Sequence, residues 1–288
     1  MPLTLRAKDW FHPDGFPLAV ERREPQEPFG LHGHDFSEIV VVTGGRGTHR
    51  IGREAWPLSA GDVFVVKGRE AHEYPDPQEL SLINVLFQPE RLKWDLGDLV
   101  HLPGYHALFT LEPHWRRRHR FNSRLHLSPA EIGHVLGFID QLDGELKTRA
   151  AGFGFMATAL FMQLVGFISR AYSRSAHPDS QSLLRIASAI THLETHFAEQ
   201  IELDDLARIA HMSKRSFLRT FRAATGQSPI AYLIQIRVNR AADRLRTTDE
   251  PVTDVAFAVG FQDSNYFTRQ FRQVMNVSPR AYRAANRG

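Results

Sequence analysis

The sequence of 288 residues contains no cysteine. This absence excludes disulfide bonds, thiolate chemistry and cysteine-based zinc sites. Long hydrophobic runs are also lacking: the strongest one, Phe161 to Ile168, is well short of the roughly 18 residues that a membrane-spanning helix needs, and Gln163 and Gly166 interrupt it. The first residues, MPLTLRAKDWFHPDGF, lack the apolar core of a secretory signal. We therefore expect a cytoplasmic protein without a membrane partner.

The residues that are present give the composition of a globular protein, with 42% hydrophobic and 23% charged residues. The net charge of +3 is unevenly distributed. From Leu183 onward the chain has 15 Lys and Arg against 10 Asp and Glu, whereas the part before it has 20 against 22. A positive excess confined to one end indicates that this end contacts a polyanion. The alternative interpretation is that the excess only keeps the surface soluble.

Short β-rich runs occupy the chain up to about residue 89. They alternate with glycine turns at Gly44-Gly45, Gly52 and Gly61-Asp62, a pattern typical of a small antiparallel barrel or sandwich. Residues 93–122 have no clear period. Basic residues in and after this stretch could recognise a carboxylate or DNA, but we interpret them as a solvated surface; they are Arg116, Arg117, Arg118, Arg120 and Arg124.

Helical patterns begin at Ser128, a candidate N-cap, with Pro129 at the first helical position. A second helix is expected over residues 154–172. The first helix has one apolar face, formed by Ile132, Val135, Leu136, Ile139 and Leu142. This face is larger than a peripheral helix needs, so we expect these two helices to hold a homodimer together.

The chain is therefore predicted to have an α+β fold with a barrel first and helices after it. The polar segment SRSAHPDSQS is expected to link two domains. The predicted parts are a β-barrel sensor (residues 1–127), a helical dimerisation region (128–172), the linker (173–182) and an all-α domain (183–288).

The all-α domain contains an internal repeat at an offset of 50 residues. Phe217 matches Phe267, Phe221 matches Phe271, Pro229 matches Pro279 and Tyr232 matches Tyr282. Each unit reads as a helix, a tight turn and a second helix, which is the helix-turn-helix arrangement. Ser213 is expected to cap the second helix of the first unit, and Asp263 or Ser264 that of the second.

The outward face of the second helix in each unit carries groups that suit DNA. Arginine suits guanine and phosphate, asparagine suits adenine, and a helix fits the major groove. A solvated charged face explains one such stripe but explains two repeat-related stripes poorly. We therefore predict that double-stranded DNA is bound by Lys214, Arg215, Ser216, Arg219, Arg222, Ser264, Asn265, Thr268, Arg269 and Arg272.

Between the units, a helix is expected from about Pro229 to Arg246. At 1.5 Å per residue it would be about 27 Å long. Recognition helices that enter successive major grooves stand about 34 Å apart, so a rigid connector of this length could hold both on one face of the DNA.

The segment LHGHDFSEIVVVTGGRG has the H-x-H-x3-E spacing of the cupin barrel. Side chains of equal parity share one face of a strand, so His32, His34, Phe36 and Glu38 would point the same way, and AGDVFVVKGREAH adds His72. His32, His34, Glu38 and His72 could bind a divalent metal, hydrogen-bond an organic ligand, or be structural. We favour the organic ligand, with Phe36 or Trp56 covering its apolar face, and expect no cofactor.

Residues 183–283 closely resemble the DNA-binding domain of AraC-family regulators, on the segment VTDVAFAVGFQDSNYFTRQFRQVMNVSPRAYR. The resemblance implies an activator in which Arg215 and Arg219, and then Asn265, Thr268 and Arg269, read bases or phosphates. It also implies that Arg222 and Arg272 contact phosphate or are structural. A further implied partner is RNA polymerase, whose sigma subunit would face residues near Asp254 and Asp263.

The sensor part, through HGHDFSEIVVVTGGRGTHRIG, LINVLFQPERL and FMQLVGFISRAY, resembles that of the rhamnose-operon activators of this family. It implies a small-molecule effector, with rhamnose favoured and another sugar or a uronic acid next, and sensor barrels of this kind usually lack a metal. We expect a ligand-controlled activator that is not an enzyme. The alternatives are a metal-dependent cupin enzyme fused to a DNA-binding tail, or a regulator whose barrel only dimerises or binds a protein partner.

Overall fold

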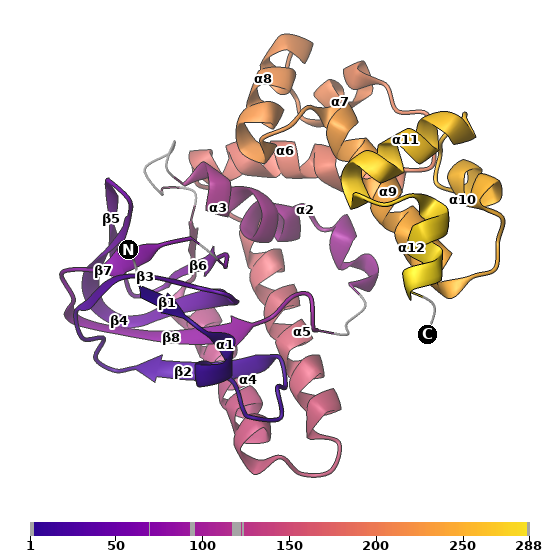
Figure 1. Cartoon of the computed structure of the whole chain (residues 1–288). Helices are drawn as coiled ribbons and strands as arrows, with labels where there is room; N and C mark the ends of the chain where they lie inside the picture. Colours follow the sequence, from indigo (N-terminus) through magenta and orange to yellow (C-terminus); the bar gives the residue numbers. More distant parts are fainter. Residues whose placement is uncertain (1–2, 69, 93–95, 117–121, 123, 287–288) are drawn as a thin grey trace. The chain divides into compact units, whose positions relative to one another are not determined.

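The computed structural model describes residues 3–68, 70–92, 96–116, 122 and 124–286. The chain divides into two compact units, residues 1–184 and 185–288 (Figure 1). This division lies inside one helix, α6 (Pro178–Thr195). The segment expected to be a linker is therefore partly helical: Ser173 ends the preceding helix, only residues 174–177 lie between the helices, and Pro178 to Ser182 form the first turns of α6.

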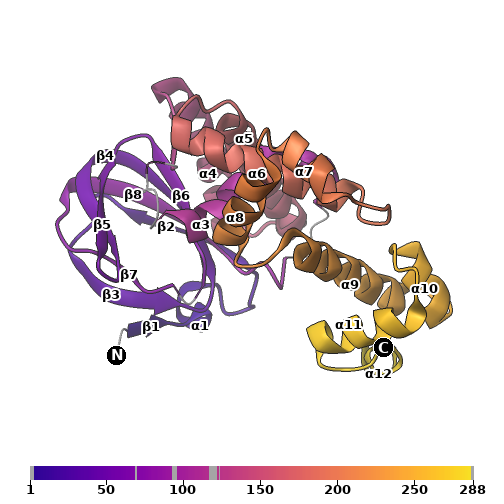
Figure 2. The same cartoon turned by 90° about the horizontal axis from the view of Figure 1, so that it is seen from above.

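Within the described residues of the first unit, nine strands form one curled sheet, the barrel-like fold expected from the sequence (Figure 2). The long strand β4 (Ser37–Ile51) pairs with β5 (Glu54–Ser59), β6 (Asp62–Val66), β7 (His72–Tyr74) and β8 (Gln78–Phe87). At the edges, β2 pairs with β8, β9 with β6, and β1 runs parallel to β3. The remaining strands are β1 (Leu3–Leu5), β2 (Leu18–Arg23), β3 (Phe29–His34) and β9 (Leu125–His126).

Short helices and two long ones complete the first unit. The short ones are α1 (Ala7–Trp10), η1 (Gly97–His101), α2 (Pro103–Tyr105), the π-helix η2 (His106–Leu111) and α3 (Glu112–Trp115). The long ones are α4 (Pro129–Thr148) and α5 (Phe153–Ser173). As predicted, Ser128 caps α4: its hydroxyl accepts from the Glu131 N–H, and the Glu131 carboxylate accepts from the Ser128 N–H.

The apolar face of α4 is used inside the unit. Val135, Ile139 and Leu142 are buried, and α4 packs against α5. Part of this face is therefore used within the unit, and the dimer expected on residues 128–172 stays a prediction. The exposed apolar side chains of the region lie on α5 instead: Phe155 is 79% exposed, Met156 46% and Met162 39%.

By length and composition alone, α5 could cross a membrane, since an 18-residue window in it has a mean hydropathy of 1.4. This property of the helix was not apparent from the sequence because its apolar residues do not form one uninterrupted run. Its other face is built into the core, where Phe161, Leu164, Val165 and Ile168 are buried and Phe161 meets Phe87 of β8 at 5.3 Å between ring centroids. A core helix of a globular protein passes the same test.

The second unit is entirely helical and repeats its own packing. Its helices after α6 are α7 (Leu203–Ile209), α8 (Lys214–Thr225), α9 (Pro229–Thr247), α10 (Val252–Ala258), α11 (Ser264–Met275) and α12 (Pro279–Asn286). Phe217 and Phe221 are buried with ring centroids 5.5 Å apart, and Phe267 and Phe271 repeat this distance. The repeat predicted from the sequence is thus seen in the structure as the same pair of phenylalanine contacts in the core of each copy.

The helix-turn-helix turns occupy equivalent positions in the two copies. His211 has φ 52° between α7 and α8, and Gly260 has φ 92° between α10 and α11. At Gly260 a Cβ atom would stand 2.7 Å from the carbonyl oxygen of Ala198, so this turn requires glycine. Ser213 caps α8 and Asp263 caps α11, each accepting from a backbone N–H three residues on, which selects Asp263 from the two candidates.

One basic residue that was interpreted as a solvated surface is in fact buried. Arg116 has no exposed surface; it donates to Glu112 at 2.8 Å and to the Val65 carbonyl. Arg124 is half-buried and pairs with the buried Asp62 at 2.9 Å. The solvated-surface interpretation is therefore wrong for these two; Arg117, Arg118 and Arg120 lie outside the described residues.

Loss of Arg116 is expected to destabilise the first unit strongly. Arg116→Met should lower its free energy of unfolding by about 3–5 kcal/mol, because Glu112 would be left buried without its cation. The double variant Glu112→Leu/Arg116→Met should lose less. Tryptophan fluorescence in a urea titration reports this unit alone, since all four tryptophans, at positions 10, 56, 94 and 115, belong to it. A loss below about 1 kcal/mol in the single variant would contradict the expectation.

Candidate functional site

The second helix of each helix-turn-helix presents one apolar and one polar face. On α8, Phe217 and Phe221 are buried while Lys214, Arg215, Arg219 and Arg222 are exposed. On α11, Phe267 and Phe271 are buried while Asn265, Thr268, Arg269 and Arg272 are exposed. The residues expected to contact DNA therefore share the solvent side of two equivalent helices, with Ser216 and Ser264 half-buried at their first turns.

Several of these polar side chains have contacts within the unit. Lys214 donates to Asp204 of α7 at 2.9 Å, and the Thr268 hydroxyl donates to the Ser264 carbonyl at 2.9 Å. The Arg269 guanidinium lies 5.8 Å from the centroid of the Tyr266 ring. The ammonium of Lys214 has further N–H groups to donate, whereas the Thr268 hydroxyl must release the carbonyl to donate to DNA.

Helix α9 separates the two helix-turn-helix motifs as expected. It has 19 residues, so its length is about 28 Å. Arg237 fixes one side of it by donating to the carbonyl oxygens of Phe197 and Glu199. The connector is thus a buried structural helix, with Val238, Ala241 and Leu245 in the core.

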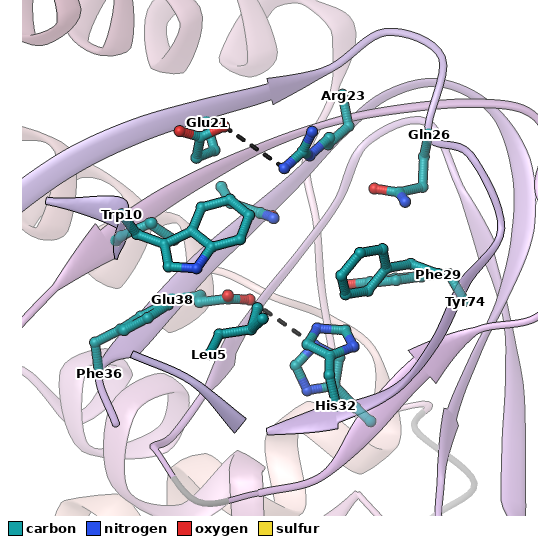
Figure 3. A pocket seen from close by; sticks show the side chains of 13 residues that line it. Leu5, Trp10, Glu21, Arg23, Gln26, Phe29, His32, Phe36, Glu38 and Tyr74 are labelled. Atoms are coloured by element: carbon teal, nitrogen blue, oxygen red, sulfur yellow. Dashed lines mark ion pairs between the residues drawn. The ribbon is translucent and has the colours of Figure 1, made fainter. Parts of the chain in front are cut away.

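The first unit contains a small, partly open cavity, with about 30 Å³ of free space, called the barrel cavity below. Figure 3 shows Trp10, Glu38 and His32 pointing into the same space, with Phe29 and Tyr74 at another side. Its mixed aromatic and polar walls are typical of a small-molecule site. The free space is far smaller than a sugar, so side chains in the wall must move to admit one. The lining residues are Leu5, Trp10, Glu21, Arg23, Gln26, Phe29, His32, Phe36, Glu38, His72, Tyr74, Asn84 and Leu86.

The structure brings four of the six expected effector residues to this cavity: His32, Phe36, Glu38 and His72. The other two do not line it. His34 lies beside it, with its ring stacked on Phe36 at 4.6 Å. Trp56 is packed in the barrel core among Val40, Ile51 and other apolar residues.

The cavity also has walls that sequence reasoning did not identify. Leu5 and Trp10 come from the N-terminal segment, where β1 pairs with β3. Arg23 of β2 lies 5.5 Å from the centroid of the Trp10 ring. The single strand expected for His32, His34, Phe36 and Glu38 is also wrong, because a bend at residues 35–36 separates β3, which carries the histidines, from β4, which carries Glu38. Strand parity cannot reveal residues supplied by other elements, so these additional walls were not predictable from it.

Burial shifts the ionisation of the groups in and beside the barrel cavity. It raises the pKa of Glu38 to about 8, and it lowers the pKa of His34 to about 4. The pKa of His72 is well below its usual range and that of His32 is lowered, both mainly because burial removes solvent from the charged form. At neutral pH these imidazoles are therefore uncharged hydrogen-bonding groups.

Comparisons with known proteins match both parts of the chain. The family described as "AraC-like ligand binding domain" matches residues 17–141, and the family described as "Helix-turn-helix domain" matches residues 206–285. The "HTH-type transcriptional activator RhaR" of Enterobacter sp. (strain 638) is 31% identical over 288 residues, covering 100% of this chain and 98% of the relative.

Two solved structures are also similar. The DNA-binding domain of AdpA in complex with a target DNA is 39% identical and covers 35% of this chain and 91% of its own, with a TM-score of 0.34. A variant of ToxT from Vibrio cholerae is 15% identical and covers 94% of this chain and 98% of its own, with a TM-score of 0.37.

A tandem helix-turn-helix unit following a barrel that matches a ligand-binding family defines a DNA-binding regulator with a ligand-binding domain. The chain belongs to the AraC family of transcriptional regulators, as the full-length similarity to a RhaR protein shows. The resemblance noted in the sequence is thereby confirmed.

We expect Arg219→Ala and Arg269→Ala each to weaken binding to the specific operator by about 1–3 kcal/mol, if each arginine makes a bidentate contact to a base. Their equivalent exposed positions on α8 and α11 are the reason. The operator is first selected from random DNA with the wild-type protein, and affinities are then compared at fixed salt. Arg246→Ala, at the end of α9, serves as the exposed control. Unchanged affinity in both test variants would remove these residues from the interface.

Proposed function

We propose that this regulator is a transcriptional activator controlled by a sugar that binds in the barrel cavity, with rhamnose as the first candidate. The observation that carries the proposal is the cavity itself, which combines aromatic rings with hydrogen-bonding groups. Trp10, Phe29 and Phe36 offer flat apolar faces, while Arg23, Gln26 and Asn84 offer polar atoms. Sugars need both kinds of surface, because their rings have apolar faces and hydroxyl-rich edges. The name of the RhaR relative supports activation and the choice of sugar.

The proposed output is DNA binding through α8 and α11, with the ten polar residues identified above as the contacts. We also propose contact with RNA polymerase near Asp254, which is exposed on α10. Asp263 is less suited to that role, because its carboxylate caps α11. A sugar controls this output only through a difference in its affinity for two states of the protein. Couplings of this kind are usually about 1–3 kcal/mol, so induction should change operator binding or activation by about 5–150-fold.

We propose further that the barrel binds its ligand without converting it chemically. We also propose that the protein acts in the cytoplasm, where its operator DNA is. The full-length relative is named as a transcriptional activator, which favours a sensor over an enzyme joined to a DNA-binding tail. Incubating the protein with the inducing sugar and analysing the sugar afterwards distinguishes the two: a sensor returns it unchanged.

Calorimetry of the full chain with a panel of monosaccharides and uronic acids tests the effector proposal. We expect one sugar to bind, and His32→Ala and Trp10→Ala to weaken it by about 5–150-fold, as the loss of a buried hydrogen bond or of an aromatic wall costs about 1–3 kcal/mol. His126→Ala is the matched control, since its ring is exposed away from the barrel cavity. If no member of the panel binds, or if the two cavity variants bind as wild type does, the proposal fails.

We propose that α5 holds a homodimer together, and the exposed Phe155 provides the test. Phe155→Glu should convert a dimer of the full chain into a monomer in sedimentation velocity at micromolar concentration, because it places a charge in an apolar contact. Arg53→Glu, in the exposed turn between β4 and β5, should leave the dimer intact. A wild-type chain that is strictly monomeric, or a Phe155→Glu variant that remains dimeric, would exclude this interface.

A further inference from the structure

Three buried side chains from three strands converge beside the barrel cavity: His34 of β3, Glu38 of β4 and His72 of β7. Their side chains are 0%, 5% and 0% exposed. The Nε2 atom of His34 lies 3.5 Å from Oε1 of Glu38, and the Nε2 atom of His72 lies 3.9 Å from Oε2. One nitrogen or oxygen from each residue falls within 4.8 Å of the other two.

The backbone determines which tautomer each imidazole adopts. Nδ1 of His34 stands 2.5 Å from the Phe36 carbonyl oxygen, and Nδ1 of His72 stands 3.3 Å from that of Glu70. A carbonyl oxygen only accepts, so each Nδ1 carries the hydrogen and each Nε2 presents a lone pair. Histidines that ligate metals are commonly oriented in this way, with the second ring nitrogen donating to a carbonyl or carboxylate.

The lone pairs on Nε2 of His34 and His72 therefore face the carboxyl oxygen atoms of Glu38. Among the residues that the structure describes, the Nε2 atoms of His34 and His72 and Oε2 of Glu38 have no hydrogen-bond partner. A proton on Glu38 could satisfy one imidazole but not both. Both nitrogen–oxygen distances also exceed the roughly 2.7–3.2 Å of a normal hydrogen bond. A cation between the three atoms would satisfy all of them at once.

We propose that His34, Glu38 and His72 bind one divalent transition metal ion. Imidazole nitrogen and carboxylate oxygen bind zinc and similar ions at about 2.0–2.2 Å, which places two ligands of one ion about 3.0–3.4 Å apart. The separations of 3.5 and 3.9 Å, and the 4.8 Å within which all three ligand atoms fall, are wider than this, so the side chains must close inward around the ion. Three protein ligands leave coordination positions open. Because Glu38 and His72 also line the barrel cavity, the ion borders that space.

His32 is close but is not part of the three-residue set. Its ring centroid is 4.3 Å from that of His72, and its Nδ1 lies 2.9 Å from the Gly30 carbonyl. His32 therefore distinguishes metal binding from ligand binding in the cavity. His32→Ala should keep most of the metal affinity, whereas each of the three ligands should be essential.

The test uses the full chain without a polyhistidine tag. Bound metal is first removed with a chelator, and no sugar is present. Co²⁺ is followed by its visible absorption and Zn²⁺ by calorimetry. We expect one ion per barrel, and at least about a 100-fold loss of affinity in Glu38→Gln and in His72→Ala, since each removes a direct ligand. Glu38→Gln keeps the shape of the side chain, and thermal melting verifies that it folds. Zn²⁺ should raise the melting temperature of wild type but not of Glu38→Gln.

A pair of histidines outside the barrel provides the control variant. His192 of α6 and His196, one residue after its end, stack with ring centroids 4.2 Å apart and could chelate an ion. His192→Ala should leave the barrel ion unchanged. The proposal is overturned if wild type binds neither metal, if Glu38→Gln binds as wild type does, or if His192→Ala abolishes binding. With no sugar present, the outcome is independent of whether the effector proposal holds.

Discussion

Desolvation of ionisable groups inside the curled sheet is the constraint on which the first unit depends. Glu38, His72 and Tyr74 reach the interior because strands of the sheet turn the same face inward, and each is shifted towards its uncharged form. Glu112 is subject to the same constraint, because burial raises its pKa to about 7 although Arg116 stands 2.8 Å away and opposes the shift. A barrel interior that disfavours isolated charge selects among ligands. It favours neutral polar molecules, or a cation whose charge the Glu38 carboxylate neutralises.

The helical unit was largely predictable because its information is local. A repeat of aromatic residues at an offset of 50 positions, with caps at Ser213 and Asp263, determines helix phase and turn position without any long-range contact. Helix phase then decides which side chains are exposed, so the polar faces of α8 and α11 followed directly. The parity of His32 and His34 on β3 was predictable for the same reason, whereas Glu38 joins them from the next strand, β4.

What the sequence did not reveal depends on contacts between distant segments. Trp10 reaches the barrel cavity only because β1 pairs with β3, more than twenty residues later. Arg116 looked like part of a charged surface run, and only its partner Glu112 and the Val65 carbonyl explain its burial. The polar composition of residues 173–182 suggested a linker, yet Pro178 begins a helix there, since proline is well suited to a first turn. The composition of a segment does not show which distant residues it contacts, and those contacts determine its structure.

The two turns at His211 and Gly260 have a consequence for how this regulator can diverge. His211 occupies left-handed backbone with a side chain, so the first copy tolerates variety at its turn. Gly260 lies against the Ala198 backbone, and any side chain there would collide with it. The second copy is therefore fixed at its hinge position while its outer face stays free to change. Substitutions on the exposed face of α11 can therefore change its contacts with DNA without disturbing the α10–α11 turn.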